Sequence, residues 1–231
     1  TVVITIVLIN CSLYITSNLL IYFFKYDIGG AGWNADYVLF NTFGGGIQII
    51  SMMLFYPLFR KFISAMQVFY VSFVMAIGGY AVLLALMFTN HTNIYILMIP
   101  GFFIFTAFGM LTVLTTVFLA NTVDYGELKN NRRDESVIFS MQTFVVKLAS
   151  GVAAMIASIC LTISNISNDT STEAAAMVSD SYTSVAVLRM TMTVLPIIGL
   201  LVAVFIFAKK YILTDEKLGE INQELAHRHK A

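Results

Sequence analysis

The side chains that could carry acid–base or metal chemistry are thinly spread along this sequence of 231 residues. His91, His227 and His229 all lie outside its long apolar segments, and no such segment contains two carboxylates. Cys11 and Cys160 lie far apart in apolar runs, a pattern typical of neither a disulfide framework nor a zinc site. Neither a Ser–His–Asp set nor metal-ligand spacing is present, so the sequence argues against an enzyme, a bound metal or a cofactor.

Lys147 is the side chain with the clearest chemical potential, because it lies eleven residues into the apolar segment that starts at Ser136. A lysine in the middle of a bilayer costs about 2.5–3.5 kcal/mol on insertion scales and normally faces an aqueous cavity or a carboxylate. No acidic residue of this chain lies at a matching depth, so we expect the partner charge to come from elsewhere. The alternative is a lysine whose stem reaches the membrane interface.

Lys147 also lies on a stripe of polar and small side chains, with Gln142 beside it. Residues three and four positions apart share one face of a helix. Such a stripe either lines a water-filled path or packs tightly on another helix, and a lysine at its centre favours the path. The other members are Ser136, Ser140, Thr143, Ser150 or Gly151, Ala154 and Ser158.

The composition indicates which elements position these residues. The chain is 58% hydrophobic and 11% charged, with a mean hydropathy of +0.84, whereas a soluble domain carries about 25% charged residues. Crossing a bilayer takes roughly 20 apolar residues in a helix. We therefore expect an all-α integral membrane protein, with a bundle over residues 1–208. Its predicted spans are residues 2–24, 37–59, 65–88, 94–120, 136–163 and 185–208.

The distribution of basic residues predicts the orientation of the bundle. Ten lie in alternate connections, against Lys25 and the segment-edge Arg189 on the opposite side, so the positive-inside rule puts both chain ends in the cytoplasm. We expect Arg189 to reach the outer interface by snorkelling. Equal numbers of acidic and basic residues give no case for nucleic-acid binding. The ten are Arg60, Lys61, Lys129, Arg132, Arg133, Lys209, Lys210, Lys217, Arg228 and Lys230.

Three connecting segments add expectations. The polar segment Ser164–Ser184 reads as a solvated outer loop, and the inner loop from Asn121 carries charges that form either an ionic latch or an ordinary solvated surface. Residues 209–231 read as a cytoplasmic tail with a short amphipathic helix capped by Thr214. A helix that docks on the rest of the chain is favoured there over a site that binds another protein. The chain starts at Thr1 without signal-peptide features, so we expect a fragment whose upstream part is missing.

One run of residues carries a family resemblance. The stretch Asp124-Tyr125-Gly126-Glu127, followed by Arg133, Glu135, Ser140, Gln142, Thr143 and Lys147, resembles the glycoside–pentoside–hexuronide:cation symporters of the major facilitator superfamily. The segment Met141–Lys147 is especially similar to the melibiose permease-like members. The match is close over residues 121–147, while the first 60 residues show a general likeness.

The resemblance implies twelve helices in two six-helix halves, each of two inverted three-helix repeats, with this chain as the C-terminal half. It assigns Gln142, Thr143, Val146 and Lys147 to the sugar and coupling region. Thr112 stands where melibiose permeases carry a tryptophan against the sugar, and Asn121 replaces an aspartate. The resemblance further implies inner-side gating by Asp124 and Arg133, together with the neighbouring charges Glu127 and Glu135.

We therefore expect half of a sugar:cation symporter that works by alternating access in a bacterial inner membrane. Its expected partners are a sugar, membrane lipid and the N-terminal six-helix half. The coupling cation, Na⁺, Li⁺ or H⁺, is expected to bind mainly in that other half, since the family's cation-binding carboxylates lie there. The alternative is a facilitator for a non-sugar solute on the same scaffold.

Overall fold

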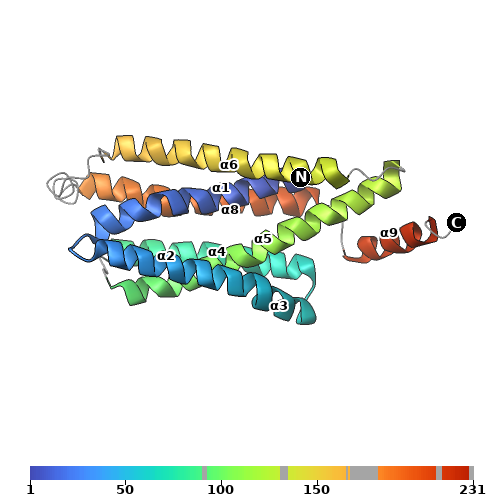
Figure 1. Cartoon of the computed structure of the whole chain (residues 1–231), viewed down its shortest axis with the longest axis horizontal. Helices are drawn as coiled ribbons and strands as arrows, with labels where there is room; N and C mark the ends of the chain where they lie inside the picture. The colour runs from blue at the N-terminus through green and yellow to red at the C-terminus, as the bar shows by residue number, and fades with distance from the viewer. Residues whose placement is uncertain (90–92, 131–134, 165, 167–181, 212–214, 229–231) are drawn as a thin grey trace.

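The computed structural model describes residues 1–89, 93–130, 135–164, 166, 182–211 and 215–228. Helices account for nearly all of these residues, and no strand occurs among them (Figure 1). The predicted all-α membrane fold with six spans is therefore confirmed. Six described stretches are long and apolar enough to cross a membrane: Val2–Ile28, Trp33–Phe62, Ala65–Phe88, Ile94–Lys129, Glu135–Ile163 and Thr183–Lys210.

Two π-helical segments extend the first span and interrupt the second. Segment η1 (Phe23–Ile28) continues α1 (Val2–Tyr22), and η2 (Ser51–Phe55) joins α2 (Trp33–Ile50) to α3 (Tyr56–Phe62). Between η1 and α2, Gly29 and Gly30 have φ angles of 64° and 83°, which other residues rarely adopt. The remaining helices are α4 (Ala65–Phe88), α5 (Ile94–Asn130), α6 (Glu135–Ile163), α8 (Tyr182–Lys210) and α9 (Asp215–Arg228).

The predicted loop after residue 120 is wrong for residues 121–130, which continue α5 to Asn130. The apolar run ends near residue 120, but a helix satisfies its own backbone hydrogen bonds and needs no apolar surroundings to continue. With 37 residues, α5 is about 55 Å long and exceeds the roughly 30 Å hydrocarbon core of a bilayer. In the predicted loop Ser164–Ser184, α8 already begins at Tyr182, and residues 165 and 167–181 lie outside the described residues.

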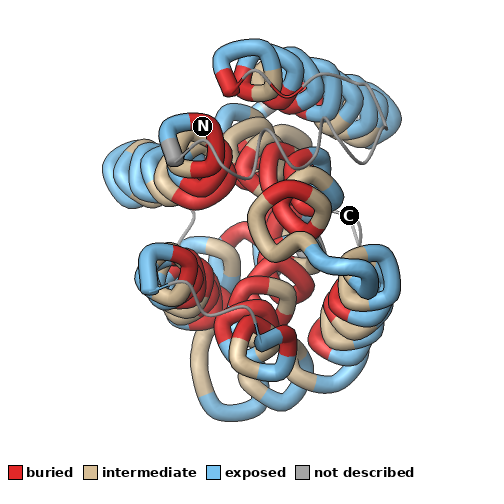
Figure 2. Tube along the Cα trace, turned by 90° about the vertical axis from the view of Figure 1, so that its left-hand side faces the viewer, coloured by how far each residue is buried: buried red, intermediate tan, exposed pale blue. Residues whose placement is uncertain are grey.

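The helices run roughly along one long axis (Figure 1). Helix α1 packs against α6 and α8, α4 packs against α5 and α8, and α2 packs against α5. We call the end with the N-terminus and α9 the tail end, and the end with the turn between η1 and α2 the turn end. A view along the axis shows buried residues facing the middle of the bundle and exposed residues facing outward (Figure 2).

Hydroxyl groups of α1 hold it against the part of α8 that contains Pro196. Pro196 has no N–H, so the carbonyl of Met192, four residues earlier, lacks its usual helical donor. Thr16 Oγ1 donates to that carbonyl at 3.2 Å and lies 2.7 Å from the hydroxyl of the fully buried Tyr80 on α4. Ser12 Oγ approaches the carbonyl of Pro196 at 3.3 Å. Three helices are thus joined by hydrogen bonds inside the bundle.

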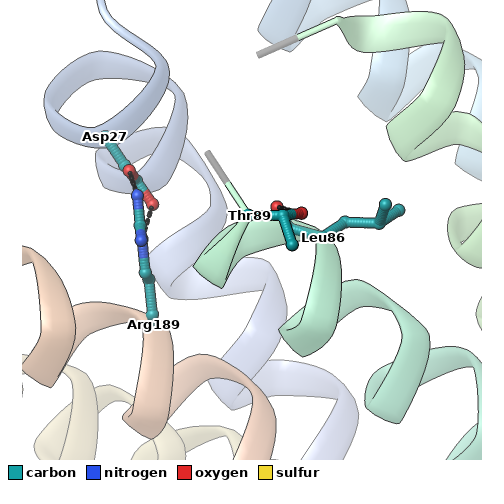
Figure 3. A network of polar contacts seen from close by, with 4 residues as sticks. All are labelled: Asp27, Leu86, Thr89 and Arg189. Atoms are coloured by element: carbon teal, nitrogen blue, oxygen red, sulfur yellow. Dashed lines mark hydrogen bonds and ion pairs between the residues drawn. The ribbon is translucent and has the colours of Figure 1, made fainter. Parts of the chain in front are cut away.

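At the turn end, Asp27 and Arg189 form an ion pair between η1 and α8 (Figure 3). Arg189 Nε donates to Oδ2 of Asp27 at 2.8 Å and Nη2 donates to Oδ1 at 2.6 Å. The side chains of Arg189 and Asp27 are only 10% and 5% exposed, respectively, so the expected snorkelling of Arg189 is wrong. The first span is longer than its apolar run predicts, and this extra turn brings Asp27 to α8.

At the tail end, aromatic rings fill the space between α4, α5 and α8. The ring centroids of Phe69 and Phe207 are 4.2 Å apart, and Phe118 lies 5.1 Å from Phe207. Helix α9 docks nearby, because Ile221 is buried against Tyr125, Leu128, Tyr211 and Leu218. Leu218 and Ile221 share one face of α9, and that face packs on the end of α5, as expected of a docking helix.

Candidate substrate cavity

A cavity of about 520 Å³ lies among α1, α2, α5 and α6. This volume falls within the range of small-molecule sites. Among the described residues, no charged side chain lines it; its polar groups are hydroxyls and carboxamides. The lining residues are Ile9, Asn10, Leu13, Tyr14, Ser17, Asn41, Gly45, Gln48, Phe105, Phe108, Thr112, Thr115, Gln142 and Val146.

Helical spacing brings the polar groups of α1 and α2 to the cavity. On α1, Asn10, Tyr14 and Ser17 are four and three residues apart and share one face. The neighbouring face of α1 carries Ser12 and Thr16, which bind α8 and Tyr80. On α2, the same spacing aligns Asn41, Gly45 and Gln48 toward the cavity.

Helices α5 and α6 supply the other wall. Thr112 Oγ1 donates to the carbonyl of Phe108 at 2.8 Å, and Thr115 Oγ1 donates to the carbonyl of Thr112 at 3.0 Å. Each threonine thus uses its hydrogen within the helix and keeps oxygen lone pairs for a ligand donor. On α6, Gln142 Nε2 lies 3.4 Å from Oγ1 of Thr116, which fixes its carboxamide beside the cavity.

A second cavity of about 30 Å³ shares Leu13, Ser17, Asn41 and Phe105 with the first. Its wall also includes Thr16 and Tyr80. Its wall is mainly apolar, and its volume equals that of one or two water molecules. The hydrogen-bonded junction of α1, α4 and α8 therefore lies directly beside the larger cavity.

The structure brings three of the five predicted substrate residues to the cavity. Thr112, Gln142 and Val146 line it, whereas Thr143 and Lys147 are exposed on α6 and do not. Thr143 Oγ1 donates to the carbonyl of Phe139 at 3.2 Å. The role of all five in binding or coupling remains a prediction.

Helix α6 carries three stripes along its length. One stripe, Val145, Ala149, Ala153, Ala157 and Cys160, is buried, and α1 is the main helix that α6 contacts. A second stripe is exposed and apolar, with Met141, Phe144, Leu148, Val152 and Met155 among its members. The third is the predicted polar stripe with Lys147, and it is exposed as well.

The predicted gating residues lie at the tail end. Asp124 and Glu127 are half-buried on the last turns of α5, and Glu135 is exposed as the first residue of α6. Arg133 lies outside the described residues. The ends of α5 and α6 face one another there (Figure 1), and the latch remains a prediction.

Sequence reasoning missed the contributions of α1 and α2 to the cavity. Asn10, Tyr14, Asn41 and Gln48 line it, although none was a candidate. The available signal was polar residues at three- and four-residue spacing within an apolar segment, the same signal that marked the stripe on α6. On α1 this signal is obscured, because Ser12 and Thr16 place polar groups on a neighbouring face.

Comparison with known proteins identifies the family. The profile described as MFS/sugar transport protein matches residues 1–215, nearly the whole chain. The chain belongs to this family. The family resemblance predicted around residues 121–147 is thus confirmed, and the six helices correspond to half of a major facilitator fold.

Individual relatives agree with this assignment. A lactose permease of Lactobacillus delbrueckii subsp. bulgaricus is 32% identical over 209 residues, which cover 89% of this chain and 31% of the permease. A raffinose carrier protein of Pediococcus pentosaceus is 28% identical over 217 residues, covering 91% of this chain and 31% of the carrier. An isoprimeverose transporter of Lactiplantibacillus pentosus is 26% identical over 147 residues, which cover 63% of this chain and 29% of the transporter. The chain therefore spans about a third of the length of these relatives.

Proposed function

We propose that this chain forms the second six-helix half of a sugar:cation symporter and that its cavity holds part of the sugar path. The uncharged cavity lined by hydroxyls and carboxamides carries the proposal. Sugar hydroxyls both donate and accept hydrogen bonds, and Asn, Gln, Ser and Thr side chains supply both kinds of partner. The names of the relatives, which refer to lactose, raffinose and isoprimeverose, support a sugar as the substrate.

The exposed polar stripe of α6 supports a second half as partner. A stripe with a lysine at its centre is costly against lipid, whereas the apolar stripe beside it suits lipid well. The polar stripe therefore faces the other six helices. Lys147 follows Val146 of the cavity wall but faces outward from this chain, and in the proposal its ammonium pairs with a carboxylate of the other half beside the sugar path.

The remaining parts of the proposal follow from this arrangement. The coupling cation, Na⁺, Li⁺ or H⁺, binds mainly to carboxylates of the other half. Both ends of this chain face the cytoplasm of a bacterial cell, since the basic ends of α3, α5 and α8 gather at the tail end. Asp124 and Arg133 act there as the inward-side latch. Transport proceeds as the two halves rock about the sugar, with the cation favouring the sugar-binding state.

The test uses the complete protein encoded by the reading frame that contains this chain, reconstituted in lipid vesicles. Uptake of labelled lactose, raffinose and isoprimeverose is measured with imposed Na⁺, Li⁺ or H⁺ gradients. We expect gradient-driven accumulation of at least one of these sugars. If the protein takes up none of the three sugars but does take up a non-sugar solute, the alternative facilitator is supported and the proposal is contradicted.

A matched pair of variants on α2 tests the cavity itself. Asn41→Leu removes a carboxamide from the cavity wall, whereas Asn34→Leu changes an exposed carboxamide two turns earlier, outside the wall. We expect Asn41→Leu to raise the KM for the sugar about tenfold, the value of one good hydrogen bond, and Asn34→Leu to leave it unchanged. Equal KM values for both variants would remove the cavity from the sugar path.

A further inference from the structure

Tyr14 is the aromatic side chain of the cavity that makes no contact with another aromatic ring among the described residues, although it packs in part against the core. Phe105 packs against Phe40 with ring centroids 5.8 Å apart, and Phe108 is almost fully buried and packs against Tyr80 at 6.3 Å. Tyr14 is half-buried, and within the described part of the chain no aromatic ring stacks on it. Its hydroxyl makes no hydrogen bond to another described residue. The part of the ring that lines the cavity and the hydroxyl are thus available to a ligand.

The backbone around Tyr14 is held in place from the other side of α1. Ser12 and Thr16, two residues before and after it, bind the carbonyls of Pro196 and Met192 on α8. These contacts fix the rotation of α1 about its own axis. The direction in which Tyr14 leaves the helix is therefore set before any ligand binds, as a preformed binding site requires.

Polar groups border Tyr14 along the helix. Asn10, one turn earlier, donates from Nδ2 to the carbonyl of Ile6 at 2.9 Å. This bond orients its carboxamide and leaves Oδ1 and the second N–H free for other partners. Ser17, almost one turn later, lines the cavity as well. An apolar ring with a polar group on each side is thus presented on one face of α1.

We propose that Tyr14 is the platform on which the ring of a neutral pyranoside stacks, with Asn10 and Ser17 binding its hydroxyls. The inference rests on the proposed function and adds a site on α1 to it. A pyranose ring has a face of C–H groups surrounded by hydroxyls. This pattern matches an aromatic ring with polar neighbours, in a cavity where the other polar groups are also uncharged.

The assignment predicts that the ring of Tyr14 matters and that its hydroxyl matters less. In the complete protein, Tyr14→Leu should raise the KM of the transported sugar about tenfold through lost stacking and apolar contact. Tyr14→Phe should leave KM within about twofold of the wild-type value. The kcat should change little in both, because platform contacts are present throughout substrate binding.

The experiment measures initial uptake rates against sugar concentration in vesicles with equal amounts of transporter. Tyr95→Leu is the matched control, since Tyr95 is 70% exposed at the start of α5 and does not line the cavity. A wild-type KM for Tyr14→Leu would overturn the inference. An equal rise in KM for Tyr14→Leu and Tyr14→Phe would also overturn it, because the hydroxyl would then be the binding group.

Two further arms keep the result interpretable. If Tyr14→Leu does not accumulate in the membrane, Tyr14→Met takes its place, with the same two decisive outcomes. Wild-type protein is measured in parallel with the three sugars named above. Absence of any sugar uptake by the wild type would contradict the proposed function, whereas wild-type uptake with an unchanged Tyr14→Leu variant would contradict the platform alone.

Discussion

The ion pair between Asp27 and Arg189 should stabilise the turn end of the bundle, and its removal should be costly. Two short hydrogen bonds, 2.8 and 2.6 Å, join side chains that are 10% and 5% exposed. Replacing one partner breaks a buried, doubly hydrogen-bonded ion pair, at a cost of about 3–5 kcal/mol. For a domain of this size, that cost lowers the melting temperature by about 6–20 °C. We therefore expect Asp27→Asn and Arg189→Met each to be strongly destabilised.

The double variant gives the sharper outcome. Replacing both partners of a buried ion pair by apolar residues is often close to neutral, because the desolvation cost disappears together with the attraction. Asp27→Leu combined with Arg189→Met should therefore recover most of the stability that Asp27→Leu or Arg189→Met alone loses. Recovery of this kind is direct evidence of energetic coupling between the two sites.

The assay is thermal unfolding of the complete protein in detergent, followed by the loss of monodisperse protein on size-exclusion chromatography. Asp36→Asn is the control, since Asp36 lies in the first turn of α2 and an interaction with the helix dipole is worth about 1 kcal/mol or less. If Asp27→Asn melts like Asp36→Asn, or if the double variant melts no higher than the single ones, the pair does not stabilise the bundle.

Three further predictions concern the helix contacts and the proposed coupling site. Thr16→Val should cost about 1–3 kcal/mol in the same unfolding assay, because it leaves the Met192 carbonyl without its hydroxyl donor. Gly109→Ala should lower the yield of folded protein, since a Cβ there would lie 2.7 Å from the backbone oxygen of Gln48. Gly78→Ala on the exposed side of α4 meets nothing within 4 Å and should be neutral. Lys147→Ala should abolish gradient-driven sugar accumulation, and Lys147→Arg should restore it only in part because a guanidinium is larger and planar. Wild-type accumulation by the alanine variant would make Lys147 a bystander.

The number and type of the helices could be predicted from the sequence, because burial in lipid depends on the mean hydropathy of about 20 residues. The helix ends could not. Residues 121–130 continue α5 although they are polar, and Asp27 lies past the apolar run in a π-helical turn that no hydropathy pattern marks. The pairing of Asp27 with Arg189 depends on two segments 162 residues apart, which a single sequence does not relate.

The candidate site could be predicted in part. The resemblance placed Gln142, Val146 and Thr112 in one functional region, and all three line one cavity. It also grouped Lys147 with them, although neighbouring positions on a helix point about 100° apart and Lys147 faces outward. Tyr14 was missed because its helix carries polar residues for two purposes, and a count of polar positions does not separate binding to a substrate from binding to α8.

That dual use of α1 links the cavity to the rest of the bundle. One face of α1 presents Tyr14 to the cavity, while the hydrogen bonds of Thr16 and the ion pair of Asp27 join the same helix to α8 at two levels. Because packed and hydrogen-bonded helices shift between discrete arrangements and do not deform continuously, a displacement of α1 should move the part of α8 from Arg189 to Pro196 with it. Under the proposed function, substrate contacts on α1 therefore act on the position of a helix pair, which is the kind of rigid element that the proposed rocking of the two halves moves.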